Sequence, residues 1–325
     1  MNAASTSPLE LAAARYGKTA TDLTPLGAFE SDVYAFAADG GEAILKVISP
    51  SHRTPAAVQA EVDWLLALVA EGVPVAAPLP SSAGRHVELV PGADGPTVLV
   101  AFRRAPGALS RPGDWTPLRL ESWGALLGRL QAHSRGWRPP GPCRGTLLEQ
   151  TYLARAAEIC GADEELAAAA TALLERARPW LDGSGDAGLV HADLHHGNVL
   201  LHGEEWTAID FDDCAYGSYA FDLAMPLYYA VRAEAAREAD AVAAEFLPPL
   251  LTGLRRHAPL PAGGAEALAV CLEARQAELY LAIKHKLPPE RWNESTRRVV
   301  DDLRRRVLAG GPVVSLDTLA ACLTG

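Results

Sequence analysis

A short polar segment near the middle of the chain carries residue types suited to phosphoryl-transfer chemistry. Asp193 lies five residues before Asn198, and Asp210 follows after one short turn. Carboxylate and amide oxygens are ligands of the kind that Mg²⁺ prefers, and Mg²⁺ keeps part of its coordination for phosphate oxygens. This order of a carboxylate, an amide and a second carboxylate is known from sites that move a phosphoryl group to a hydroxyl. The spacing therefore predicts Asp193 as the general base and Asn198 and Asp210 as metal ligands.

The residues that follow Asp193 are expected to bring these side chains together. Apolar runs over 198–201 and 206–211 flank a polar turn, which is typical of a two-stranded hairpin. Closing this hairpin would place Asp193, Asn198 and Asp210 at one end of it. The pattern therefore predicts one metal-dependent site.

The same segment resembles a known family of enzymes. His191, Asp193 and Asn198, followed by Ile209-Asp210, are similar to the catalytic and metal-binding segments of the aminoglycoside phosphotransferase/choline kinase-like family. The resemblance implies a bilobal, protein-kinase-like α+β fold with a small antiparallel-sheet N-terminal lobe and a larger, mainly helical C-terminal lobe. It also implies Mg²⁺ and ATP or GTP as cofactors. The acceptor would be a hydroxyl of a small molecule such as an antibiotic, an amino sugar or an amino alcohol.

A further likeness in this region keeps a second class of acceptor open. The run 210–214, with Gly217 and 222–223, resembles a branch that contains bacterial stress-response Ser/Thr kinases and homoserine kinases. A Ser/Thr protein kinase is therefore the alternative, although the interval between Asp210 and Asp222 is too short for a long activation loop. A nucleotide-binding pseudokinase that acts as an interaction module is a third hypothesis, and the intact polar residues argue against it.

Histidines and further carboxylates surround the predicted catalytic residues. The resemblance implies that His191 fixes the catalytic loop and that Asp222 caps the backbone amides of this loop. Imidazole binds Zn²⁺ readily, so His191, His195 and His196 could form a transition-metal cluster, but adjacent histidines point in different directions. Asp212 and its neighbour would either hold a substrate ammonium or be ordinary solvated carboxylates.

The N-terminal third supplies candidates for nucleotide binding. Lys46 lies within 43–47, which resembles the strand whose lysine pairs with nucleotide phosphates. A helix is predicted over 54–71, because apolar residues recur at helical spacing and Pro55 suits the first helical position. Glu61 of this helix is the candidate that would hold Lys46 by a charge-assisted hydrogen bond, and a plain surface glutamate is the alternative.

Contacts to the base and the phosphates carry weaker signals. By resemblance, backbone groups of the hinge over 101–103, including Ala101 and Arg103, would bind the adenine, and no side chain there separates ATP from GTP. The predicted phosphate loop, 27–34, lacks the glycine pattern of protein kinases. Ser31 stands where the family often has an asparagine, and its hydroxyl or backbone N–H could bind phosphate oxygens.

The expected elements change from strands to helices near residue 105. Strands of an antiparallel sheet are predicted over 23–29, 33–38, 43–48, 86–90 and 96–102. Helices are predicted over 11–17 and then over 118–133, 146–159, 164–181, 219–232, 234–257, 265–286 and 289–308. The change indicates a nucleotide-binding lobe over 1–104 and a catalytic and substrate-binding lobe over 105–325.

Composition disfavours several classes of protein. The formal net charge is −11, and fourteen acidic residues but only two arginines fall between 158 and 222. This acidity argues against non-specific nucleic-acid binding, and it could attract a cationic acceptor or be simply solvated. No apolar run reaches the roughly 18 residues of a membrane span, and no signal peptide is recognised. Five scattered cysteines without a C-x-x-C pair fit a reducing cytoplasm, and the oligomeric state stays open.

Overall fold

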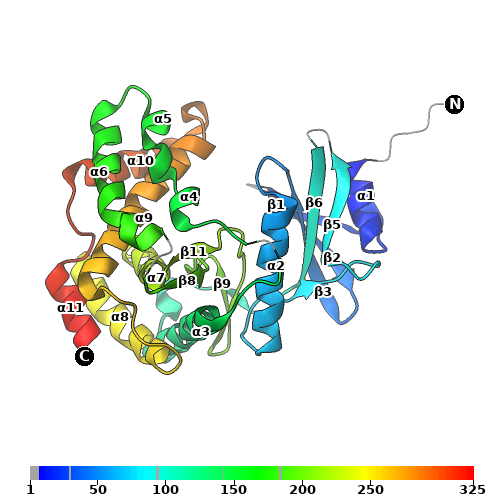
Figure 1. Cartoon of the computed structure of the whole chain (residues 1–325), viewed down its shortest axis with the longest axis horizontal. Helices are drawn as coiled ribbons and strands as arrows, with labels where there is room; N and C mark the ends of the chain where they lie inside the picture. Colours follow the sequence, from blue (N-terminus) through cyan, green and yellow to red (C-terminus); the bar gives the residue numbers. More distant parts are fainter. Residues whose placement is uncertain (1–6, 29–30, 93–94, 142, 183–184) are drawn as a thin grey trace. The chain divides into compact units, whose positions relative to one another are not determined.

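The computed structural model describes residues 7–28, 31–92, 95–141, 143–182 and 185–325, which form two compact units (Figure 1). The first unit comprises Met1–Gly107, Arg138–Arg144 and Thr207–Asp212. The second unit comprises Ala108–Trp137, Gly145–Trp206 and Asp213–Gly325. Each unit holds a different part of the predicted site.

An antiparallel sheet dominates the first unit. Its strands are, in spatial order, β1 (Thr24–Ala28), β2 (Ser31–Ala38), β3 (Gly41–Ile48), β6 (Gly95–Arg103) and β4 (Pro78–Leu79), and β5 (Val87–Gly92) also pairs with β6. Gly40 and Gly41 close the β2–β3 hairpin with φ of 85° and 139°, a backbone conformation that glycine adopts without steric cost. The glycine pair therefore forms the predicted turn.

Two helices cover opposite faces of this sheet (Figure 1). Helix α1 (Pro8–Arg15) packs on one face, where its residues share a buried cluster with Leu45, Leu99 and Ala101. Successive strand side chains point to opposite faces, so Lys46 points to the face covered by α2 (Pro55–Ala70). The side chain of Thr54 caps α2 by accepting a hydrogen bond from the N–H of Ala57. The sheet and α2 thus present Lys46 and Glu61 on the same side.

The second unit is mainly helical. Its helices are α3 (Pro117–Gly136), α4 (Leu147–Gln150), α5 (Ala156–Cys160), α6 (Glu164–Leu181), α7 (Tyr219–Ala233), α8 (Ala239–Arg255), α9 (Gly264–Lys286), α10 (Glu294–Ala309) and α11 (Leu316–Thr324). One small sheet has the strand order β10 (Glu205–Ala208), β9 (Val199–His202), β7 (Ala108–Leu109), and a second pairs β11 (Ala215–Ser218) with β8 (Ala187–Val190). These short strands and α7 carry the predicted catalytic loop.

Helices α3 and α8 approach each other unusually closely. A Cβ atom built at Gly124 would lie 1.8 Å from the main-chain oxygen of Leu250, and one built at Gly253 would lie 1.8 Å from that of Glu121. Both values are far inside van der Waals contact, so only glycine fits at either position. The two glycines therefore set the distance between these helices.

Several predicted elements differ from the observed ones. The hairpin strand predicted over 206–211 ends at Ala208, because Asp210 has a φ of 62° that no strand accommodates. The helix predicted over 146–159 is broken into α4, a 3₁₀ turn over Tyr152–Arg155 and α5, since the side chain of Thr151 accepts the N–H of Leu153 and starts a new turn.

Other predicted element boundaries also differ from the observed ones. Helix α8 begins at Ala239 instead of residue 234, and the strand expected to give way to a hinge at 101–103 continues to Arg103. The strands β8 and β11 and the helix α11 were not predicted at all. Phe29, Glu30, Ala93 and Asp94, which fall in the predicted phosphate loop and hairpin turn, lie outside the described residues.

None of the helices within the described ranges is both long and apolar enough to cross a membrane.

Candidate functional site

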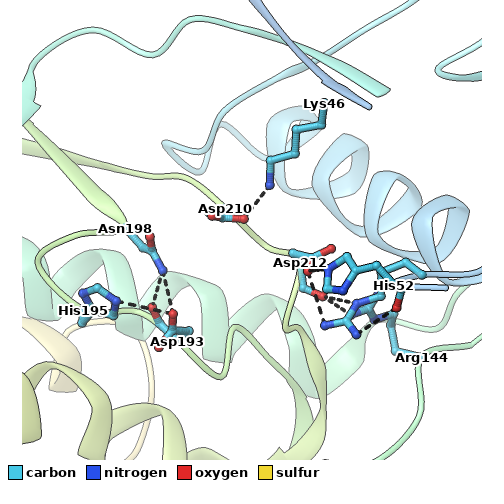
Figure 2. Close-up of polar contacts among 9 residues, drawn as sticks. Lys46, His52, Arg144, Asp193, His195, Asn198, Asp210 and Asp212 are labelled. Atoms are coloured by element: carbon cyan, nitrogen blue, oxygen red, sulfur yellow. Dashed lines mark hydrogen bonds and ion pairs between the residues drawn. The ribbon is translucent and has the colours of Figure 1, made fainter. Parts of the chain in front are cut away.

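Lys46 and Asp210 form an ion pair in the first unit (Figure 2). The Nζ of Lys46 donates a hydrogen bond of 2.5 Å to Oδ1 of Asp210. Burial alone would lower the pKa of Lys46, but the charges of Asp210, Glu61 and Asp212 outweigh it and raise that pKa. Lys46 therefore stays protonated and can present a full positive charge to phosphate oxygens.

Glu61 lies on the same side of the sheet and is 2% exposed. Burial raises the pKa of its carboxyl group, while the charge of Lys46 opposes this rise. Lys46 donates its hydrogen bond to Asp210, and the charge of Glu61 also raises the pKa of Lys46. The hydrogen bond expected between Glu61 and Lys46 stays a prediction.

Asp212 is held by three basic side chains of the first unit (Figure 2). Its Oδ2 lies 2.6 Å from Nε2 of His52 and 3.4 Å from Nη2 of Arg53. Arg144 donates one hydrogen bond to the main-chain oxygen of Asp212 and another, of 3.2 Å, to that of Ala57 in α2. The segment that contains Asp210 is thus connected to α2 through Arg144 and to the residues just before α2 through the side chain of Asp212.

This network corrects the prediction for Asp212, which is neither a solvated carboxylate nor one exposed to an acceptor. It is 8% exposed, and burial would raise its pKa. The hydrogen bond from His52 and the charges of Arg53 and Lys46 outweigh burial and lower the pKa of Asp212 far below its usual range. Asp212 is therefore a buried anion next to the segment that is predicted to bind metal.

Asp193 and Asn198 are directly hydrogen-bonded in the second unit. The Nδ2 group of Asn198 donates to the main-chain oxygen of Asp193 at 2.9 Å and to its Oδ2 at 3.0 Å. The amide oxygen of Asn198 consequently points away from Asp193 (Figure 2). This orientation leaves the oxygen, which is the atom that a metal ion would bind, on the far side of the amide.

His195 donates toward the same carboxylate. Its Nδ1 accepts the N–H of Gly197 at 2.9 Å, so the proton of the neutral ring is on Nε2. Nε2 lies 3.4 Å from Oδ2 of Asp193. The loop geometry thus fixes the tautomer of His195 and directs an N–H group at the predicted base.

Arg275, from the middle of α9, is a partner of Asp193 that was not predicted. Its Nη2 donates to Oδ1 of Asp193 at 2.7 Å and to the hydroxyl of Tyr229 at 2.5 Å. Burial would raise the pKa of Asp193, but the charge of Arg275 and the hydrogen bond from His195 outweigh it and lower that pKa. Asp193 is therefore ionised and already neutralised by an internal counter-ion.

Asp222 is hydrogen-bonded to the backbone of the predicted catalytic loop. It is 1% exposed, and its two carboxylate oxygens accept the backbone N–H groups of His191 at 3.2 Å and Ala192 at 2.9 Å. His191 is fully buried, and its Nδ1 accepts the N–H of Asp193 at 3.3 Å. Among the described non-glycine residues, Ala192 and Asp210 are the two with positive φ, 69° and 62°. Strained backbone of this kind clusters at functional sites.

The predicted nucleotide contacts lie on the sheet of the first unit. Ser31 begins β2 and pairs with Ile48. Ala101 is fully buried in β6, and the N–H of Arg103 donates to the main-chain oxygen of Ala77 at 2.8 Å. Since β6 continues through Arg103, these residues are strand residues, and their part in binding the base stays a prediction.

The oxygen atoms of Asn198 and Asp210 are the candidates to hold a divalent metal ion, and one lies in each unit. Both are oxygen ligands of the type that fits Mg²⁺ or Ca²⁺ better than Zn²⁺. No group of three or more His, Cys, Asp or Glu side chains that could hold a metal ion occurs within the described part of the chain. The approach of Asp210 to Asn198 stays a prediction.

Comparisons with known proteins agree with this chemistry. A model of the phosphotransferase enzyme family matches residues 22–260. Amicoumacin kinase of Bacillus subtilis (strain 168) is 27% identical over 311 residues, which cover 94% of this chain and 93% of that protein. An uncharacterized protein of Deinococcus radiodurans (strain ATCC 13939 and synonymous strains) is 30% identical over 216 residues, covering 65% of this chain and 62% of that protein.

Two solved structures resemble the whole chain. Amicoumacin kinase hAmiN, in complex with AMP-PNP, Ca²⁺ and Ami, has a TM-score of 0.87 and 26% identity and covers 95% of both chains. A microcompartment-associated aminopropanol kinase has a TM-score of 0.67 and 25% identity, covering 92% of this chain and 94% of that one. These likenesses confirm the predicted α+β, protein-kinase-like fold and a reaction that uses a nucleotide and a divalent metal ion. The chain therefore belongs to the phosphotransferase enzyme family and is a kinase that transfers a phosphoryl group to a hydroxyl of a small molecule.

Proposed function

We propose that this enzyme uses Mg²⁺ and ATP to phosphorylate a hydroxyl of amicoumacin or of a related antibiotic or amino alcohol, in the cytoplasm. The observation that carries the proposal is the likeness to amicoumacin kinase hAmiN over 95% of both chains at a TM-score of 0.87. The aminopropanol kinase, at 0.67, is the basis for including smaller amino alcohols. A small-molecule acceptor is thereby favoured over a protein acceptor and over a pseudokinase.

In this proposal the first lobe, 1–104, binds the nucleotide and the second, 105–325, supplies the base and the acceptor site. Lys46 neutralises phosphate charge, and its affinity for anions is supported by its raised pKa. Asp210 and Asn198 provide oxygen ligands for the metal ion, which would supply further neutralisation of the transferred phosphoryl group. Glu61, Ser31 and the hinge residues Ala101 and Arg103 contribute to nucleotide binding.

Asp193 would orient the acceptor hydroxyl and take its proton. The hydrogen bonds from Asn198 fix the plane of its carboxylate, and Arg275 and His195 keep it ionised. A base with a lowered pKa accepts a proton weakly, which suits a loose phosphoryl-transfer transition state in which the hydroxyl loses its proton late. His191 and Asp222 hold the loop that carries this base.

The test is a mass-spectrometric assay of purified enzyme with amicoumacin and either Mg–ATP or Mg–GTP. The product should gain about 80 Da, one phosphoryl group. The variant Asp193→Asn has the same size as the wild type and should lose about 10²- to 10⁴-fold in kcat while it keeps its nucleotide affinity. If the wild type leaves amicoumacin and aminopropanol unmodified, the proposed acceptors are wrong.

A further inference from the structure

We propose that Arg275 and Tyr229 form a subsite for an oxygen-bearing, uncharged or anionic group of the acceptor, next to the hydroxyl that is phosphorylated. A carbonyl, carboxamide or carboxylate would fit there, whereas an ammonium group one carbon away from the acceptor hydroxyl would be disfavoured, so this inference argues against small amino alcohols among the acceptors proposed above. This inference rests on the proposed function in one respect, since it takes Asp193 as the residue that binds the acceptor hydroxyl.

The charge of Asp193, the predicted base, is balanced by Arg275. The guanidinium of Arg275 lies 2.7 Å from Asp193, and the two side chains are only 15% and 17% exposed. An ammonium group near the acceptor hydroxyl would therefore meet a carboxylate whose charge is already balanced, and it would also meet the arginine at short range.

The hydroxyl group of Tyr229 is oriented by its hydrogen bond to Arg275. The hydroxyl oxygen of Tyr229 accepts an N–H from Arg275, so the phenolic proton is left to donate to another group. The ring of Tyr229 is stacked on His195, with ring centroids 4.1 Å apart and planes 26° apart. Two attachments thus hold Tyr229 in one orientation and present its O–H as a fixed donor.

Arg275 also carries a buried hydrogen-bond donor. The Nε–H of Arg275 is buried and has no hydrogen-bond partner among the residues that the structure describes. A buried N–H without an acceptor is costly, and a binding role is one reason why such a group is retained. Together with the hydroxyl of Tyr229, it makes the surroundings of Asp193 rich in donors, and such surroundings match oxygen atoms that accept hydrogen bonds.

Two small alcohols that differ at one group distinguish the possibilities. In 2-hydroxypropanamide the carbon that bears the hydroxyl is bonded to a carboxamide, and in 1-amino-2-propanol it is bonded to a CH₂ that carries an ammonium. Two like charges about 5 Å apart in a partly buried site repel each other strongly enough for about a 100-fold effect, and the attraction of the ammonium to Asp193 and the solvent both lower it. In the presence of Mg–AMP-PNP the wild type should therefore bind the amide 10- to 100-fold more tightly, as measured by calorimetry or NMR titration.

Variants assign this preference to the two residues. Arg275→Gln removes the charge and should reduce the ratio of the two affinities at least 10-fold, whereas Arg275→Lys keeps the charge and should preserve most of it. Tyr229→Phe should weaken the amide but not the ammonium compound. Tyr228→Phe is the matched control on the same helix and should leave both affinities unchanged. Thermal unfolding checks that each variant is folded.

The outcomes separate this inference from the proposed function. Any one of three results would overturn the subsite. Either the wild type binds the ammonium compound as tightly as the amide, or it binds neither compound, or Arg275→Gln leaves the ratio of the two affinities unchanged. If amicoumacin is not phosphorylated, the proposed acceptor is wrong. If the preference for the amide nevertheless depends on Arg275, the subsite is supported.

Discussion

Replacing Asp222 by alanine should destabilise the protein and slow the reaction at once. The carboxylate is 1% exposed and accepts the backbone N–H groups of His191 and Ala192. Alanine would leave both donors buried without an acceptor, at about 1–3 kcal/mol each. Burial raises the pKa of Asp222, so part of this cost is offset because a buried charge is removed as well. We therefore expect a loss of about 2–4 kcal/mol in the free energy of unfolding.

The kinetic effect has a separate cause. The N–H of Asp193 donates to Nδ1 of His191, so a shift of His191 displaces the predicted base. A displacement of about 1 Å of a catalytic group can cost about 100-fold in rate. Steady-state kinetics, recorded well below the unfolding transition of the variant, should show this loss in kcat and little change in nucleotide affinity.

A matched control separates loop support from general stability. Asp186 is also a carboxylate of the second unit that accepts a backbone N–H, that of Ala262 at 2.8 Å, but it is not hydrogen-bonded to the catalytic loop. Asp186→Ala should lower the free energy of unfolding, as measured by urea denaturation, with a native kcat. A native kcat in Asp222→Ala, or a loss of stability below about 0.5 kcal/mol, would refute the reasoning.

Three further predictions concern packing, pH and phosphate binding. Gly124→Ala would place a methyl group 1.8 Å from a main-chain oxygen of α8 and should lower the free energy of unfolding in urea by about 1–3 kcal/mol or more. Gly136→Ala, with no atom within 4 Å of the added methyl group, should be neutral or slightly stabilising. The pKa of Asp193 is lowered, so kcat/KM should persist below the usual aspartate pKa of about 3.9 and fall only as the pH drops through the lower pKa of the folded state. Arg275→Gln should raise the pKa of Asp193 and so move this acid limb of the pH–rate profile to higher pH. An unmoved limb would contradict the assignment. Lys46→Met should raise the KM for the nucleotide at least 10-fold while the acceptor KM changes little, and equal changes in both would count against a phosphate-binding role.

Residues close together in sequence were the most predictable part of the site. Asp193 and Asn198 are five positions apart in one loop, so their hydrogen bond follows from local geometry. Lys46 could be placed on a strand because it lies in a short apolar run that follows a glycine turn. Helix α6 was predicted over its observed bounds, although Pro179 lies inside it; a proline in the last turn removes one hydrogen bond without ending the helix.

Contacts between distant segments could not be predicted from one sequence. Arg275 is 82 positions from Asp193, and an arginine within an Ala- and Glu-rich helix looks like a solvated surface residue. Arg144 follows a proline-rich loop that has no periodic pattern, so nothing indicated that it would bind Asp212. Strands β8 and β11 have four residues each, which is too short for a period to be recognised.

The division of the chain has a consequence for dissecting the protein. The first compact unit recruits Arg138–Arg144 and Thr207–Asp212 from later in the chain, and the second of these segments brings the acidic partner of Lys46. A fragment truncated after Gly107 would keep the partly buried Lys46 and the buried Glu61 but lose Asp210, Asp212 and Arg144. Expression of the N-terminal part alone should therefore give an incompletely paired, unstable product, and chimaeras between relatives need to exchange all three pieces together.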